Sequence, residues 1–118
     1  MICEGVVEKY SMGRSTGFGV KNWKTRFLTL TRHQLAYADK QGADPKHEMG
    51  VSAISVVWQN PTPKDHPQAN PGKPMFMVRV WSNGVFDLLV NCLTQVEKDK
   101  WVNGLKEALK DAKGVQWV

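Results

Sequence analysis

Residues 24–31 alternate in character with a period of two, which is typical of a strand with one buried face. Leu28 and Leu30 share a face of that strand, and Lys24 and Arg26 continue the same row towards its beginning. Because burying an unpaired charge is very costly, this row can be buried only at its apolar end. We therefore expect the two cations where the inner face of a curved sheet meets water.

Two neighbouring segments repeat this arrangement. Val7 shares a face with Lys9 in one predicted strand, and Leu35 shares a face with Tyr37 in another. If the strands follow one another in antiparallel order, four polar side chains meet at one open end of the sheet: Lys9, Lys24, Arg26 and Tyr37. Cations at strand ends often serve solubility alone, but three strands with the same feature favour a phosphate-binding site.

The remaining pattern predicts a mainly β chain of one domain, residues 1–118, that ends in a single helix. Strands are expected over residues 4–10, 23–31 and 34–39, as one or two strands within 49–58, and on both sides of a hairpin turn at 82–84. Residues 59–74 hold five of the six prolines and predict a long, solvated loop. Such a loop can also serve as a docking segment for another protein.

The helix is predicted over residues 94–113. Thr94 and Glu97 form a capping box, in which each side chain satisfies a backbone donor of the first turn. An apolar stripe led by Trp101 and Leu105 marks the buried face, and Gly114 is expected to end the helix. Such a helix would close one open end of a barrel.

The net charge of +5 favours an anionic partner, without saying of which class. Two cysteines, Cys3 and Cys92, are too few for a disulfide framework, and Cys92 fits a core position. His33, His47 and His66 lack metal-ligand spacing, and we expect them to be exposed. No nucleophile motif or complete phosphate loop is present, so we expect neither an enzyme nor a cofactor or metal site.

The chain resembles the pleckstrin homology (PH) domain family over essentially its whole length. The resemblance rests on Glu4-Gly5, on the run from Asn22 to Leu30, and on the helix segment from Glu97 to Leu105. It implies a seven-stranded antiparallel barrel of two near-orthogonal sheets, capped by the C-terminal helix. It further implies a cytoplasmic protein that attaches peripherally to membranes through phosphoinositide headgroups held at the open end of the barrel.

The resemblance also implies which side chains hold the headgroup. The basic residue late in the first strand looks like Lys9, and the pair early in the second strand looks like Lys24 and Arg26. Tyr37 is similar to a tyrosine on the third strand, and Lys46 to a basic residue after it.

The glycine-rich connection over residues 11–22 is expected to add to this site. Arg14 and Lys21 supply further positive charge, and backbone amides between glycines can cradle phosphate. Phe18 and Val20 are placed to insert into the acyl boundary of a bilayer. Alternatively, Phe18 folds back onto the barrel.

Other functions remain open at this point. A barrel of this kind can bind a peptide or a GTPase through a sheet edge or groove, with an exposed apolar patch that involves Trp58 or Trp81. It can also bind a simpler anionic lipid such as phosphatidic acid. Nucleic-acid binding is disfavoured, because no base-stacking sheet motif is present.

Overall fold

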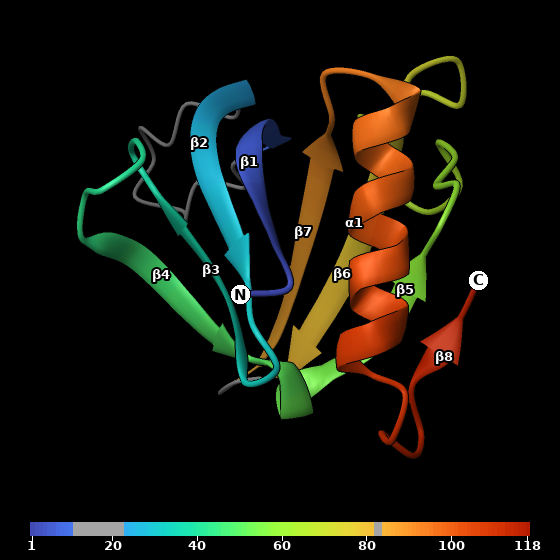
Figure 1. The fold of residues 1–118 in the computed structure, drawn as a ribbon. Helices are drawn as coiled ribbons and strands as arrows, with labels where there is room; N and C mark the ends of the chain where they lie inside the picture. The colour runs from blue at the N-terminus through green and yellow to red at the C-terminus, as the bar shows by residue number, and fades with distance from the viewer. Residues whose placement is uncertain (11–22, 82–83) are drawn as a thin grey trace.

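The structure, a computed structural model, describes residues 1–10, 23–81 and 84–118. Its elements follow one another as β1 (Cys3–Tyr10), β2 (Trp23–Leu30), β3 (Gln34–Ala38), β4 (Pro45–Gly50), a 3-10 turn (Val51–Ala53), β5 (Ile54–Trp58), β6 (Met75–Trp81), β7 (Val85–Asn91), α1 (Gln95–Ala108) and β8 (Gln116–Trp117). The strands form one sheet in the order β4-β3-β2-β1-β7-β6-β5-β8 (Figure 1). The predicted mainly β chain with one C-terminal helix is confirmed.

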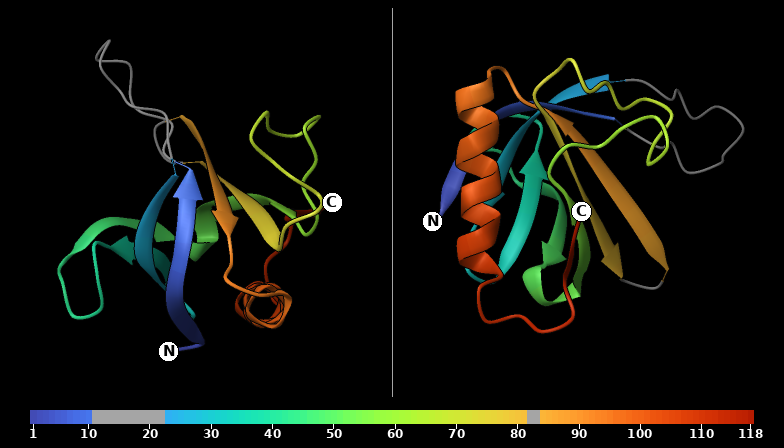
Figure 2. Two further views of the ribbon diagram at one scale, coloured as in Figure 1. Left: turned by 90° about the horizontal axis from the view of Figure 1, so that it is seen from above. Right: turned by 90° about the vertical axis from the view of Figure 1, so that its right-hand side faces the viewer.

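The sheet bends back on itself into a sandwich that is not closed. Strands β1 to β4 form one half and β5 to β8 the other, with α1 across one end (Figures 1 and 2). The two halves are joined where β1 pairs with β7, over Glu8–Tyr10 and Leu89–Asn91. This barrel-like sandwich matches the expected architecture, and the described residues form one strand more than the expected seven, because the two-residue β8 pairs in parallel with β5.

Strand β2 follows the alternation read from its sequence. Leu28 and Leu30 are buried, whereas Lys24 is exposed and Arg26 is half-buried. The inner row therefore runs from the core to water along a single strand. This change of environment along one face is what places cations at the open end of the sandwich.

Helix α1 is held at its start by the Thr94 half of the predicted capping box, in which the Glu97 backbone N–H donates to the Thr94 hydroxyl at 3.1 Å. The Glu97 carboxylate instead pairs with Lys100 at 2.7 Å. It ends at Ala108, so the predicted extent of 94–113 is too long. Leu109 caps it, and the following residues turn the chain back towards β5. Gly114, with a φ of +86°, lies in that turn rather than at the end of the helix.

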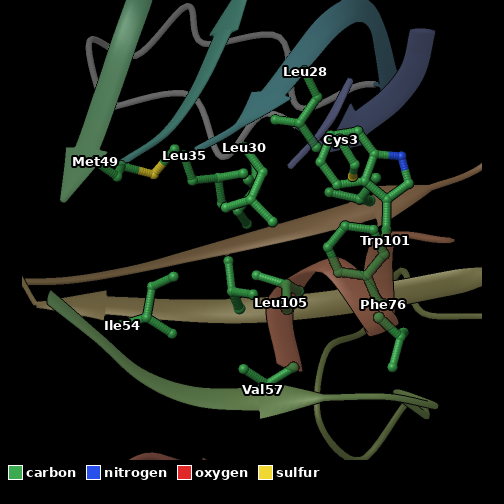
Figure 3. Packing of buried hydrophobic residues seen from close by; sticks show 14 of the residues in the cluster. Cys3, Leu28, Leu30, Leu35, Met49, Ile54, Val57, Phe76, Trp101 and Leu105 are labelled. Atoms are coloured by element: carbon green, nitrogen blue, oxygen red, sulfur yellow. The ribbon is translucent and has the colours of Figure 1, made fainter. Parts of the chain in front are cut away.

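The main core lies between the two halves of the sheet and α1. Trp101 and Leu105 project from α1 into this space, where Trp101 stacks on Phe76 with ring centroids 6.2 Å apart (Figure 3). Leu28 and Leu30 reach the same core from β2. The helix thus fixes the spacing of the two halves that carry the open end.

The segment between β3 and β5 differs from its prediction. Strand β4 begins at Pro45, before the expected segment 49–58, and a 3-10 turn separates it from β5. The side chains of Lys46 and Glu48 are exposed, and polar residues occupy these positions. The start of β4 therefore lacks the alternation of apolar residues by which a strand is predicted. Cys92 is buried as predicted.

The proline-rich segment 59–74 contains no helix or strand, as predicted, but it is not merely a solvated loop. Ala69 and His66 are buried, and the His66 ring meets the Tyr10 ring edge-on at 5.4 Å. The segment covers an apolar cluster on the outer face of the sheet that includes Trp58 and Met77. The predicted exposure of His66 is therefore wrong, and Trp58 offers no exposed patch, because apolar neighbours bury it.

Replacing the helix tryptophan tests whether α1 holds the two halves together. Trp101→Ala removes a fully buried indole that packs on Phe76, and we expect it to lower the free energy of unfolding by about 3–5 kcal/mol. Val96→Ala on the same helix removes a side chain that is 76% exposed and should change stability by less than about 0.5 kcal/mol. Chemical denaturation of both variants measures the difference, and equal stabilities would contradict this packing account.

Candidate anion-binding site

Strand register brings the predicted side chains onto three adjacent strands. Lys9 of β1 lies opposite Lys24 of β2, and Arg26 lies two residues further along β2. Tyr37 of β3 lies opposite Leu28 of β2. The inner faces of these strands thus present the four side chains at the same end of the sandwich.

Lys9 is the most constrained member of this group. Its side chain is buried, with the residue only 6% exposed, and its Nζ lies 4.3 Å from the centroid of the Tyr37 ring. Within the part of the chain that the structure describes, no carboxylate forms an ion pair with it. Burial, together with repulsion from Arg26, Lys24 and Lys46, lowers the pKa of Lys9 to about 8.

Asp39 is the carboxylate that lies among these cations. Its Oδ1 is 3.6 Å from Arg26 Nε and 3.5 Å from Lys46 Nζ, and its side chain is 56% exposed. One exposed carboxylate is thus shared by two cations, whereas Lys9 and Lys24 form no ion pair among the described residues. The site therefore keeps an excess of positive charge.

Lys46 reaches the group from β4, as the resemblance implied. The pairing of β3 with β4 shifts register between Tyr37 and Ala38, and Lys46 lies on the extra residue of β4 at this irregularity. Asp39 was missed in the sequence, although it continues the face that carries Leu35 and Tyr37. The same parity rule, applied two residues further, would have found it.

Tyr37 lies between Lys9 and a second aromatic layer. Its ring stacks on His47 at 5.8 Å, and His47 in turn meets Phe86 of β7 at 5.4 Å. Burial raises the pKa of the Tyr37 phenol, so the hydroxyl remains a neutral hydrogen-bond donor at physiological pH. Neither His47 nor Phe86 was expected at the site. The start of β4, which carries His47, was not predicted, and no sequence pattern brings Phe86 of β7 next to that strand.

Several predicted contributors lie outside the described residues. These are the cations Arg14 and Lys21 and the apolar residues Phe18 and Val20, all within residues 11–22. Their part in binding stays a prediction. The five residues that the structure does bring together are Lys9, Lys24, Arg26, Tyr37 and Lys46.

The chemistry of the group suits binding of a multiply charged anion. A guanidinium presents several donors in a fixed plane, and ammonium groups add point charges, which together match phosphate oxygens. Among the described residues, no three His, Cys, Asp or Glu side chains are grouped so that they could hold a metal ion. In the same ranges, no helix is long and apolar enough to cross a bilayer.

The lowered pKa of Lys9 predicts a measurable stability effect. Between pH 8 and the ordinary lysine pKa of 10.5, the unfolded chain binds more protons than the folded one, so folding stability rises with pH in that window. Below pH 8, holding Lys9 protonated costs the folded state on the order of 3 kcal/mol. Part of that cost is offset by the contact with Tyr37.

Lys9→Met should therefore raise the free energy of unfolding by about 1–3 kcal/mol at pH 7 and abolish the rise above pH 8. The matched control is Lys64→Met, which removes an exposed cation in segment 59–74 and should leave stability within about 0.5 kcal/mol of the original. Urea denaturation across pH 6–10 measures both effects. A Lys9→Met variant that is less stable at pH 7 than the original chain would show that the amine is not under strain.

Comparison with known proteins gives a consistent family and fold. The family model described as "PH domain" matches residues 1–110. A solution structure of a pleckstrin homology domain is 19% identical, with a TM-score of 0.67, and the match covers 98% of this chain and 90% of that one. The comparison with curated proteins found no match.

Two further solved structures are similar in fold. The C-terminal PH domain of pleckstrin in complex with D-myo-Ins(1,2,3,4,5)P5 is 22% identical, with a TM-score of 0.62 and coverage of 91% of this chain and 96% of that one. A chain from a crystal structure of sifa and skip is 18% identical, with a TM-score of 0.66 and coverage of 92% and 97%.

Proposed function

Because this chain belongs to the PH domain family, a family of binding modules that are generally not enzymes, we propose that it recruits its host protein to membranes by binding phosphoinositide headgroups. The headgroup lies at the open end of the sandwich, between the first strands. Lys9, Lys24, Arg26 and Lys46 hold the ring phosphates, and the Tyr37 hydroxyl donates to one of them. The membrane is the cytosolic face of an anionic bilayer.

The observation that carries this proposal is the excess of positive charge around a buried amine. Lys9 is held at a site where burial and three cations lower its pKa, and an arriving phosphate removes part of that repulsion. A ligand with several negative charges therefore gains more binding free energy here than at a surface where each lysine is already paired with a carboxylate. Similar domains such as the C-terminal PH domain of pleckstrin have been solved with inositol phosphates, which supports the same ligand class.

A ligand must compete with Asp39, the carboxylate that Arg26 and Lys46 share, for these two cations. Asp39 is exposed and bonds Arg26 and Lys46 at 3.5 to 3.6 Å, distances at which ion pairs near water contribute little. A phosphate with two or more negative charges can displace it from both cations. Arg26 then turns its planar donors from Asp39 to the ligand, while the backbone around it stays in place.

Removing the two cations of β2 tests the proposal. Lys24→Ala with Arg26→Ala should weaken binding to phosphoinositide-containing vesicles by at least about 100-fold, since charge-assisted bonds of this kind contribute roughly 1.5–3 kcal/mol each. The matched control is Lys64→Ala with Lys73→Ala, which removes the same charge from exposed positions in segment 59–74. Thermal unfolding of both variants confirms that they are folded.

Equal retention of the Lys24→Ala, Arg26→Ala variant and the original chain on such vesicles would refute the proposal. Equal loss in both double variants would show that net charge alone attracts the domain to the membrane. Competition by soluble inositol phosphates distinguishes headgroup binding from attachment to a simpler anionic lipid such as phosphatidic acid.

A protein partner is the second candidate function, and one feature of the surface favours it. A groove of about 280 Å³ runs between α1 and the start of segment 59–74. Its wall includes Lys98, which is only 7% exposed and donates from Nζ to Asn60 Oδ1 at 2.6 Å. Carboxamides of Gln59, Gln95 and Asn103 line the same groove and can pair with a peptide backbone. Loss of partner binding in a Lys98 variant that still binds lipid would assign the two functions to separate surfaces.

A further inference from the structure

The end of β6 and the start of β7 carry two apolar side chains that the described part of the fold does not bury. Trp81 is 59% exposed and Val85 is 51% exposed. The two residues are direct partners in the antiparallel pairing of β6 with β7, so their side chains lie side by side on one face. They form the last pair of the hairpin that the structure describes before its turn, and we call them the hairpin-tip pair.

The hairpin-tip pair lies on the outer face of β6 and β7, and the next residue of β7 begins a series of contacts that leads to the anion-binding site on the inner face. Phe86 follows Val85 directly, and its ring meets His47, which stacks on Tyr37. Tyr37 in turn lies under the Nζ of Lys9. The inner face of the hairpin end is thus separated from the buried amine by two aromatic rings beyond Phe86, while Trp81 and Val85 lie on its outer face.

The overall arrangement places the hairpin tip away from the helix. In the right-hand view of Figure 2, α1 stands on one side of the molecule, and the joined ends of β6 and β7 lie on the opposite side. The end of β1 and the start of β2 also lie on that side, above the joined ends of β6 and β7 in this view. A flat surface that contacts the open end can therefore reach the hairpin tip without meeting α1.

The charges near the pair do not oppose an anionic surface. Asp87, the next residue of β7 on the same face as Val85, is held by Arg79 through two bonds of 2.8 and 3.0 Å. This pair is neutral overall, and the Arg79 guanidinium lies over the Trp58 ring. An indole beside a neutral patch, next to a cationic site, suits the interfacial layer of a bilayer, where tryptophan side chains gather.

We propose that Trp81 and Val85 insert into the interfacial layer of the bilayer and form a membrane contact separate from headgroup binding. This inference rests on the proposed phosphoinositide function, because the bound headgroup is what holds the open end against the lipid. The headgroup site gives selectivity, and the hairpin-tip pair adds affinity and fixes the tilt of the domain. In this arrangement the side chains of the hairpin-tip pair enter the bilayer, and no acyl chain has to enter the sandwich.

The experiment measures the affinity of one double variant for two ligands. Trp81→Ala with Val85→Ala is measured against soluble inositol trisphosphate by calorimetry, and against phosphatidylcholine vesicles that contain phosphoinositide by sedimentation. We expect unchanged affinity for the soluble headgroup and roughly tenfold weaker vesicle binding, which is the effect of losing a partly buried indole and isopropyl group. Val96→Ala, which removes an apolar side chain that is 76% exposed on α1, should change neither.

A second measurement does not depend on the double variant. Brominated phosphatidylcholine in the vesicles should quench part of the tryptophan fluorescence of the original chain, and Trp81→Phe should lose that quenched part. Unchanged vesicle binding by the double variant, or equal quenching with Trp81→Phe, would overturn the inference while the headgroup site stands. Failure of the original chain to bind either ligand would refute the headgroup proposal, and this inference with it.

Discussion

Repulsion between like charges around Lys9 is the constraint on which the functional account depends. Strand register fixes Lys9 opposite Lys24, with Arg26 two residues further along the neighbouring strand. Lys46 arrives from β4, and only the exposed carboxylate of Asp39 lies between two of these cations among the described residues. Burial prevents water from screening the amine, and the pKa of Lys9 falls to about 8 as a result.

Such a site lowers the stability of the folded state, and packing elsewhere in the fold offsets that loss. Trp101 and Leu105 of α1 hold the two halves of the sheet together from the opposite end. The proline-rich segment covers the outer face behind the site, with His66 against Tyr10. Because these contacts hold β1 and β2 in place, the cations cannot relieve their repulsion by moving apart. A ligand that neutralises these cations would gain the free energy released when their repulsion is removed.

The parts of this structure that could be predicted follow from periodic patterns. The parity of Leu28, Leu30, Lys24 and Arg26 predicted both the strand and the environment of its two ends, and Thr94 with Glu97 predicted where the helix begins. The helix end was misjudged, because Ala112 continues the apolar stripe although the chain must turn back to reach β5. Asp39 was missed because the parity rule was not applied beyond Tyr37, and His47 was missed because β4 carries polar residues and its pairing contains a register shift that no periodicity reveals.

The burial of the proline-rich segment could not be predicted for a different reason. Its contacts with Tyr10 and Met77 join residues distant in sequence, and the segment itself has no regular pattern. Trp58 was named, as an alternative to Trp81, in the exposed patch of a protein-binding domain, but the end of β5 that carries it lies under the same segment. Trp81, at the end of the next strand, is 59% exposed among the described residues.

Direct titration of the Lys9 amine tests the central claim. NMR spectroscopy of the lysine side chains can follow its protonation in the free domain and in the presence of saturating soluble inositol trisphosphate. The account predicts a pKa of about 8 for Lys9 in the free domain and a clear rise on binding, because the phosphates replace repulsion by attraction. A pKa near the ordinary 10.5 in the free domain, or one that the ligand leaves unchanged, would contradict it.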